Sequence, residues 1–112
     1  MREYVVRLSD QADEDVDKIY GYIASTLKEP QTAERLYNRI MDEIGTLNTL
    51  PERYELYQKK PWFDMGLRKL VVGSYVVLYL VLEAKGEVAI ARVFYGGMDI
   101  SRQLSATDFK SV

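Results

Sequence analysis

The hydrophobic positions of the chain follow a helical period in two successive segments. Apolar residues recur every three or four positions through residues 10–27 and again through residues 33–47, which places them on one face of a helix. The apolar positions are Ala12, Val16, Ile19, Ile23 and Leu27 in the first segment, and Ala33, Leu36, Tyr37, Ile40, Ile44 and Leu47 in the second. Ser9 is a suitable N-cap for the first helix, and Pro30 suits the first turn of the second. Because only a few residues separate the segments, the pattern predicts an antiparallel helical hairpin.

Short runs with the character of strands lie on both sides of this hairpin. Residues 4–8 alternate between apolar and polar, and three further runs follow at about residues 67–72, 75–83 and 88–95. Gly73 and Ser74 fit a two-residue turn between the first two of these runs. The run 75–83 is apolar at nearly every position, which predicts a central strand that is buried on both faces.

The remaining segments show neither the helical nor the strand periodicity of apolar residues. Residues 52–65 predict a loop that carries aromatic residues and two lysines. The polar tail after Gly97 predicts at most a short turn of helix in residues 99–104, and we expect it to fray toward Val112.

The predicted order is therefore strand, two helices and three strands in one α+β domain. The domain spans residues 1–112, with its core at about residues 3–104. We expect an antiparallel-rich sheet with the helical hairpin on one face and the other face partly open. The sequence does not fix where the first strand pairs.

The composition excludes several kinds of chemistry. The chain has no cysteine and no histidine, so thiol nucleophiles and histidine bases are excluded. A metal site would need oxygen ligands alone, and the sequence shows neither a clustered Asp/Glu motif nor a Gly-rich phosphate loop, so we expect no metal and no cofactor. The N-terminus lacks the apolar region of a signal peptide, and the run 75–82 is too short to cross a bilayer. We therefore expect a cytoplasmic protein without a membrane partner.

Charge is distributed unevenly between the two halves of the chain. Residues 1–57 carry a net charge of −5 and residues 58–112 carry +3, within a total of −2. A locally basic surface can attract a polyanion or an acidic protein even when the whole molecule is acidic. The alternative interpretation is a modest fluctuation on solvated faces.

Four segments together resemble the RelE/ParE superfamily of toxins from bacterial type II toxin–antitoxin systems. They are YVVRLSDQADEDVDKIYGYI, AERLYNRIMDEIGTLNTLPERY, GLRKLVVGSYVVLYLV and VAIARVFYGGMDI, which occur in the order and spacing of the superfamily over roughly residues 3–104. The resemblance implies the fold predicted above. It also implies a cognate antitoxin, whose disordered segment would wrap the toxin and fold on binding.

The superfamily divides by target. RelE-like members resemble metal-independent endoribonucleases that cut messenger RNA on the ribosome with Arg, Lys and Tyr side chains. Cations of this kind can stabilise the extra negative charge of a pentacovalent phosphate, while an RNA 2′-hydroxyl serves as the nucleophile. ParE-like members resemble inhibitors of DNA gyrase that lack this cationic set.

The cations of the ribonuclease members are only partly present in this sequence. Val76 stands where many of them carry Arg after a Tyr, and Gly97 and Met98 stand where many carry further cations. Among the residues that remain, the resemblance implies a catalytic role for Arg68 and Tyr95. It implies RNA or partner binding for Lys59, Lys60, Lys69, Arg92 and Arg102.

Several of these candidates also have a structural interpretation. Arg68 and Lys69 are adjacent on one strand and therefore point to opposite faces, where either could serve to keep a sheet edge soluble. For Arg92 we favour an ion pair with an acidic residue of the first helix, and for Tyr95 a role in closing the core.

Three functions follow from the resemblance. The first is a toxin that inhibits translation by ribosome-dependent mRNA cleavage and is neutralised by its antitoxin. The second is a non-enzymatic toxin that binds gyrase or another protein, which the missing cations favour. The third is a catalytically degenerate homologue, retained as half of a complex. Plasmid stabilisation is the associated biological role.

Overall fold

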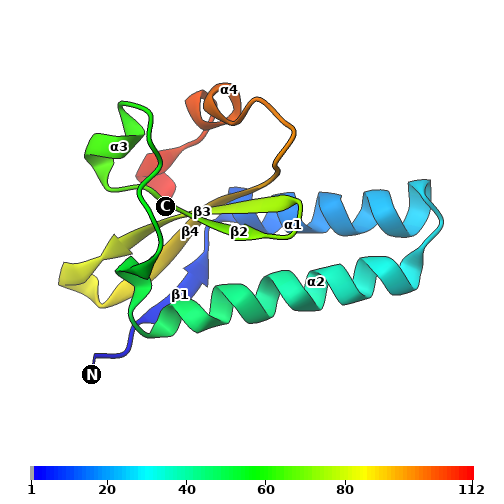
Figure 1. Ribbon diagram of the computed structural model, residues 1–112, viewed down its shortest axis with the longest axis horizontal. Helices are drawn as coiled ribbons and strands as arrows, with labels where there is room; N and C mark the ends of the chain where they lie inside the picture. The colour runs from blue at the N-terminus through cyan, green and yellow to red at the C-terminus, as the bar shows by residue number, and fades with distance from the viewer. Residues whose placement is uncertain (1) are drawn as a thin grey trace.

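The computed structural model describes residues 2–112 (Figure 1). The strands are β1 (Val5–Leu8), β2 (Arg68–Val72), β3 (Tyr75–Leu82) and β4 (Glu87–Tyr95). The helices are α1 (Asp10–Gly21), which continues as a π-helical turn (Tyr22–Thr26), α2 (Pro30–Gly45), α3 (Trp62–Met65) and α4 (Ile100–Ser105). The predicted α+β fold is confirmed, α3 is added to the predicted order, and α4 lies where the sequence predicts a short turn of helix.

The strands form one mixed sheet in the order β1-β4-β3-β2. Strands β2, β3 and β4 pair antiparallel in chain order, whereas β1 pairs parallel to β4, from Val5 opposite Glu87 to Leu8 opposite Ile90. A bulge interrupts the β3–β4 register, because Leu78 lies opposite Arg92 while Tyr79 lies opposite Ile90. The edges of the sheet are therefore β1 and β2.

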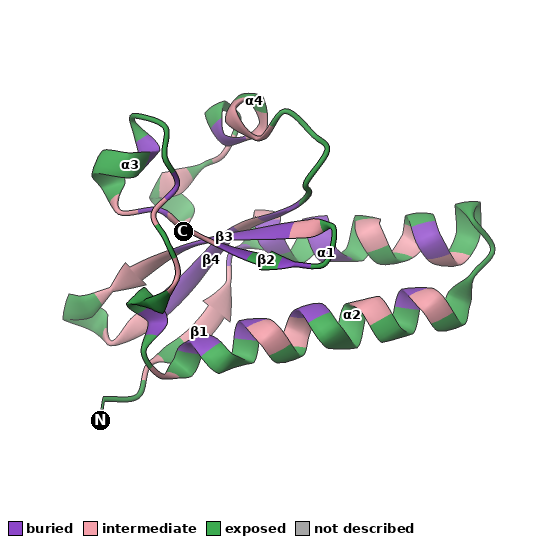
Figure 2. Cartoon of the chain, viewed as in Figure 1, coloured by how far each residue is buried: buried purple, intermediate pink, exposed green. Residues whose placement is uncertain are grey.

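The helical hairpin of α1 and α2 covers one face of the sheet and extends beyond it (Figures 1 and 2). The Ser9 side chain caps α1 by accepting from the Ala12 N–H at 3.1 Å, and Pro30 lies at the start of α2, as the sequence predicts. The buried residues of this face are Ala12, Val16, Ile40, Ile44, Leu47, Leu70, Val72, Val77, Tyr79, Val88, Ile90 and Val93. Most positions of the predicted apolar stripes thus join the main core, but Leu27 and Tyr37, which the sequence places on the stripes, are 48% and 38% exposed.

The opposite face is covered over most of its area, and Val71 of β2 remains 59% exposed on it, so the prediction of a partly open face holds only near this edge. Residues 57–67 and 100–112 lie over it and form a structure that we call the cap. Its core consists of Tyr57, Trp62, Leu67, Val76, Leu78, Ala91, Phe94 and Leu104, with Ile100, Phe109 and Val112 packed against it. Short segments cover this face because a few large side chains supply the apolar contact that a helix would otherwise provide.

Two local predictions also change in the cap. The segment predicted as a loop contains α3, and Leu56 makes a bridge to Arg68 at the start of β2. The short turn of helix predicted in residues 99–104 is present as α4. The end of the chain, which the sequence predicts to fray, instead forms a 3-10 turn (Phe109–Ser111), and Phe109 and Val112 pack against the cap core. In the described chain, no helix combines the length and the apolar character needed to span a membrane.

Candidate functional site

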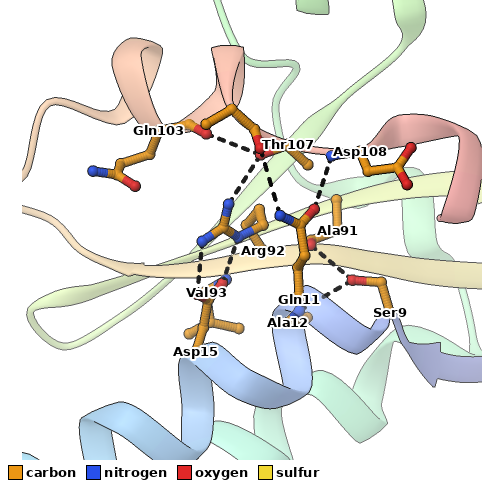
Figure 3. Close-up of polar contacts among 11 residues, drawn as sticks. Ser9, Gln11, Ala12, Asp15, Ala91, Arg92, Val93, Gln103, Thr107 and Asp108 are labelled. Carbon is orange, nitrogen blue, oxygen red and sulfur yellow. Dashed lines mark hydrogen bonds and ion pairs between the residues drawn. The ribbon is translucent and has the colours of Figure 1, made fainter.

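Strand β4 extends beyond its partner β1, and side chains of α1 bind the edge left open. The Ser9 hydroxyl donates to the carbonyl of Ala91 at 2.8 Å, and Asp15 accepts from the N–H of Val93 at 3.0 Å (Figure 3). The N-cap residue and one residue of α1 thereby satisfy a backbone edge that would otherwise lack partners.

Arg92 completes this arrangement. Its Nε and Nη2 donate to the two carboxylate oxygens of Asp15 at 2.7 and 2.8 Å, and its Nη1 donates to the hydroxyl of Thr107 at 3.2 Å (Figure 3). The guanidinium also lies 4.6 Å from the ring centroid of Phe94. The side chains of Arg92 and Asp15 are 11% and 10% exposed. The ion pair expected for Arg92 is confirmed, and its donors are directed at the protein itself.

Arg68 is likewise held by the chain. Its Nη1 donates to the carbonyls of Glu52 and Tyr54 at 3.2 and 2.7 Å, and its Nη2 lies 3.6 Å from the carboxylate of Glu52. Beside it on β3, the hydroxyl of Tyr79 donates to the carbonyl of Pro51 at 2.6 Å. Burial raises the pKa of Tyr79 to about 12, although the charges of Arg68 and Arg53 oppose this shift. Arg68 and Tyr79 therefore fasten residues 51–54 to the sheet.

Lys69 lies on the opposite face of β2 from Arg68, as the alternation of a strand requires. Its Nζ is 3.3 Å from Glu55. Lys59, Lys60 and Arg102 are exposed on the cap, and Lys60 makes a loose ion pair with Asp64 at 3.7 Å. These three cations are available to a ligand.

Tyr95 lies at the other end of the sheet from Arg68. The register places Arg68 in the row of Tyr79 and Ile90, five residues before Tyr95 on β4. At about 3.3 Å per residue, the two side chains are separated by roughly 15 Å along the strands. The structure thus does not bring together the two residues predicted to be catalytic.

Tyr95 borders an exposed groove between α1 and the ends of β3 and β4. The groove has a volume of about 580 Å³. We call it the tyrosine groove, and its lining residues are Lys18, Ile19, Tyr22, Tyr75, Tyr95 and Met98. Tyr22 is 57% exposed, Tyr95 52% and Met98 42%, so the expectation that Tyr95 closes the core is wrong. Burial is the main cause of the raised pKa of Tyr75, with smaller contributions from Tyr95 and Tyr22.

Gly97 shapes this groove. A Cβ atom at this position would lie 2.5 Å from the Cε2 atom of Tyr95. The absence of a side chain therefore allows the Tyr95 ring to lie against the backbone, edge-on to Tyr75 at a centroid distance of 5.8 Å. A cation at position 97 would displace this ring.

Sequence reasoning missed Tyr22 and Met98 as groove residues. Tyr22 lies off the apolar stripe of its helix, and Met98 follows a pair of glycines in an irregular segment. The available signal was the excess of tyrosines, nine in the chain, several of them outside the predicted core. Among residues 2–112, no group of three or more Asp and Glu side chains lies together in a way that could hold a metal.

The fold recurs in solved structures of toxin–antitoxin complexes. One is the chromosomal ParDE system from P. aeruginosa, which is 19% identical with a TM-score of 0.68 and covers 83% of this chain and 96% of that one. Another is the RelBE2 complex from Mycobacterium tuberculosis, which is 22% identical with a TM-score of 0.60 and covers 85% and 93%. Among curated proteins, none matches the sequence.

A family model described as the ParE toxin of type II toxin–antitoxin systems, parDE, matches residues 6–100. The chain therefore belongs to the ParE toxin family, and the resemblance to the RelE/ParE superfamily is confirmed.

Proposed function

We propose that this type II toxin acts by binding a protein target through the tyrosine groove, without cleaving RNA itself. One observation carries the proposal: Arg68 and Tyr95 lie at opposite ends of the sheet, and Arg68 is committed to carbonyls of its own chain. A ribonuclease of this type needs cations and a proton carrier at one phosphate.

The groove offers what a protein interface uses. Exposed tyrosines and a methionine provide apolar contact with polar tips, and such residues dominate binding energy at interfaces. Lys18 is exposed at its border and makes no ion pair with another part of the described chain. It can therefore bind a carboxylate of the partner.

We propose DNA gyrase as the target, because the family match is to ParE toxins and ParE-like members resemble gyrase inhibitors. A cognate antitoxin would neutralise the toxin, and the similar solved structures, which are toxin–antitoxin complexes, support this partner.

Ribosome-dependent mRNA cleavage is the second candidate. Lys59, Lys60 and Arg102 are exposed on the cap, which favours contact with a polyanion. In this alternative, Arg68 would have to leave its carbonyl partners in order to reach a phosphate.

One pair of assays separates the two candidates. The purified, antitoxin-free protein is added to a gyrase supercoiling reaction and to a cell-free translation reaction in which cuts are mapped by primer extension. We expect supercoiling to be inhibited and the message to stay intact.

Matched variants assign the activity to the groove. Tyr22→Ala should weaken inhibition at least tenfold. Tyr20→Ala, which removes an exposed tyrosine that faces Tyr37 outside the groove, should change it less than twofold. Discrete ribosome-dependent cuts that disappear in Arg68→Ala would overturn the proposal in favour of RNA cleavage.

A further inference from the structure

A second hollow lies between α1 and α2, apart from the tyrosine groove. It has a volume of about 270 Å³ and is lined by Asp17, Tyr20 and Tyr37. The two rings meet edge to face, with centroids 6.2 Å apart and an interplanar angle of 86°. Tyr20 is 39% exposed and Tyr37 38%, so both rings present surface to solvent beside a carboxylate.

Carboxylates lie along the seam between the two helices. Three of them recur on α1 at spacings of three and four residues, a pattern that continues to Tyr20 and places them on one side of the helix. The fourth lies one turn before Tyr37 on α2. All four are exposed, and none makes an ion pair within residues 2–112. We call this surface the acidic seam, and it consists of Tyr20, Tyr37, Asp10, Asp13, Asp17 and Glu34.

Folding explains only part of this charge. Asp10 and Asp13 lie in the first turn of α1, where the helix dipole stabilises a carboxylate. Asp17 lies two turns beyond Asp10, and Glu34 follows the first turn of α2, so this effect has faded at both positions. Asp13 and Asp17 are also four residues apart, a spacing at which like charges destabilise a helix. The helices alone therefore do not account for the charge beside the tyrosine pair, which points to a ligand.

An aromatic pair beside a carboxylate has the chemistry of a cation site. A cation over the face of a tyrosine ring is attracted by the ring quadrupole, and a carboxylate pairs with the same cation. Arginine suits both contacts, because its planar group stacks on a ring and binds two carboxylate oxygens at once. Arg92 makes the same two contacts inside this chain, since it binds both oxygens of Asp15 and lies 4.6 Å from the centroid of the Phe94 ring.

The acidic seam and the tyrosine groove lie on opposite sides of α1. Asp17 and Tyr20 line the hollow of the seam, whereas Lys18 and Tyr22 line the groove. Residues two positions apart, such as Tyr20 and Tyr22, are separated by about 200° around a helix. A partner on the seam therefore leaves the groove open to the target.

We propose that the acidic seam docks a basic segment of a protein, with one arginine side chain seated against Tyr20 and Tyr37 and paired with Asp17. The remaining carboxylates of the seam attract further cations of the same segment. An acidic segment would meet unpaired carboxylates and would be repelled. The inference does not depend on which target the groove binds, and it gives the toxin a second interaction surface.

Titration of the isotope-labelled whole toxin with a blocked Gly-Arg-Gly-Arg-Gly peptide, followed by NMR, tests the proposal. We expect saturable shifts at the amides of Asp17, Tyr20 and Tyr37 and at both rings, with no shift at Tyr95 in the groove. The lysine analogue of the peptide should bind at least threefold more weakly, because an ammonium lacks the planar fork of a guanidinium. The glutamate analogue should not bind.

Matched variants separate the seam from general charge attraction. Asp17→Asn should weaken peptide binding at least fivefold. Asp42→Asn makes the same change at an exposed aspartate of α2 that also lacks an ion pair but lies outside the seam, and it should weaken binding less than twofold. Tyr37→Leu, which removes the ring but keeps an apolar side chain, should weaken binding at least fivefold, whereas Tyr37→Phe should weaken it less than twofold.

Each outcome decides the proposal. Saturable shifts at the seam together with the losses in Asp17→Asn and Tyr37→Leu support it. Wild-type toxin without saturable shifts at the seam overturns it, whether or not Tyr37→Leu folds, and so do equal losses in Asp17→Asn and Asp42→Asn, which would show non-specific charge attraction. Spermidine binding at the same residues more tightly than the arginine peptide would reassign the seam to a small polycation. Self-association of the toxin alone that Asp17→Asn abolishes would reassign it to basic residues of a second copy. Either reassignment overturns the proposal.

Discussion

The helical hairpin and the cap cover opposite faces of the same sheet by different means. The hairpin buries a continuous apolar stripe from two long helices, so its stability is spread over many contacts. The cap consists of short segments that a smaller apolar core and a few polar anchors hold in place. The Tyr57 and Ser101 hydroxyls lie 3.0 Å apart, the backbone N–H of Asp108 donates to Oε1 of Gln11 at 2.8 Å, and Nη1 of Arg92 donates to the hydroxyl of Thr107 at 3.2 Å.

This difference indicates which face of the sheet can lose its cover by local unfolding. A face held by distributed apolar contact unfolds together with the whole domain, whereas a face held by a few anchors can detach locally. Asp15 links the hairpin to the cap, because it lies on α1 and binds Arg92, which in turn contacts Thr107 of the cap.

Asp15→Ala should have the largest effect. It leaves Arg92 partly buried without its counter-ion and removes the acceptor of the Val93 N–H. We expect a loss of about 3–5 kcal/mol in the free energy of unfolding, measured by urea denaturation. Asp17→Ala, at an exposed site on the same helix, is the control. A loss below about 1 kcal/mol for Asp15→Ala would show that the ion pair is not the link between the two faces.

A pair of cavity variants compares the faces directly. Ile44 on the hairpin and Leu104 in the cap are 2% and 1% exposed. Ile44→Ala should cost about 3 kcal/mol and accelerate exchange at all protected amides, because it weakens global stability. Leu104→Ala should cost about 1 kcal/mol in global unfolding, because the cap detaches first.

Hydrogen exchange measures the distinction between these two variants. In Leu104→Ala, we expect amides of residues 100–112 to accelerate while those of α1 and α2 do not. Equal acceleration in both helices would mean that the cap and the hairpin unfold as one unit.

Tyr79→Phe should have the smallest effect on the free energy of unfolding near neutral pH, and the size of this effect should depend on pH. The pKa of Tyr79 is raised to about 12 from 10.0, so the neutral form stabilises the fold fully below pH 10, and this contribution is lost as the pH rises from 10 to 12. We expect wild type to lose about 2–3 kcal/mol over this range relative to Tyr79→Phe. At pH 7 the variant should be less stable by about 1 kcal/mol, the value of its bond to Pro51. Parallel pH profiles of the two proteins would contradict this assignment.

The sequence predicts best those parts of the structure in which apolar residues recur in a regular pattern. The stripes of the two helices and the apolar run of β3 each repeat often enough to indicate both the element and its buried side. The ion pair of Arg92 was also predictable, because a cation within an apolar strand requires a partner when it is buried.

The cap and the site were not predictable in the same way. The cap is held by isolated residues such as Trp62 and Phe109, which belong to no repeating pattern. The separation of Arg68 from Tyr95 depends on register, and the tyrosine groove depends on the place where α1 passes the end of β4. Motif resemblance identifies residue types but not the distances between them.

The parallel pairing of β1 with β4 delays folding of the sheet during synthesis. Val5 pairs with Glu87, so the first strand leaves the ribosome long before its partner exists. At about 5–20 residues per second, this wait lasts roughly 4–16 s. During that interval the helical hairpin can form, but the sheet, the groove and the cap cannot. The groove and the cap can therefore form only when the chain is nearly finished, so the proposed binding of a target through the groove can begin only at that point.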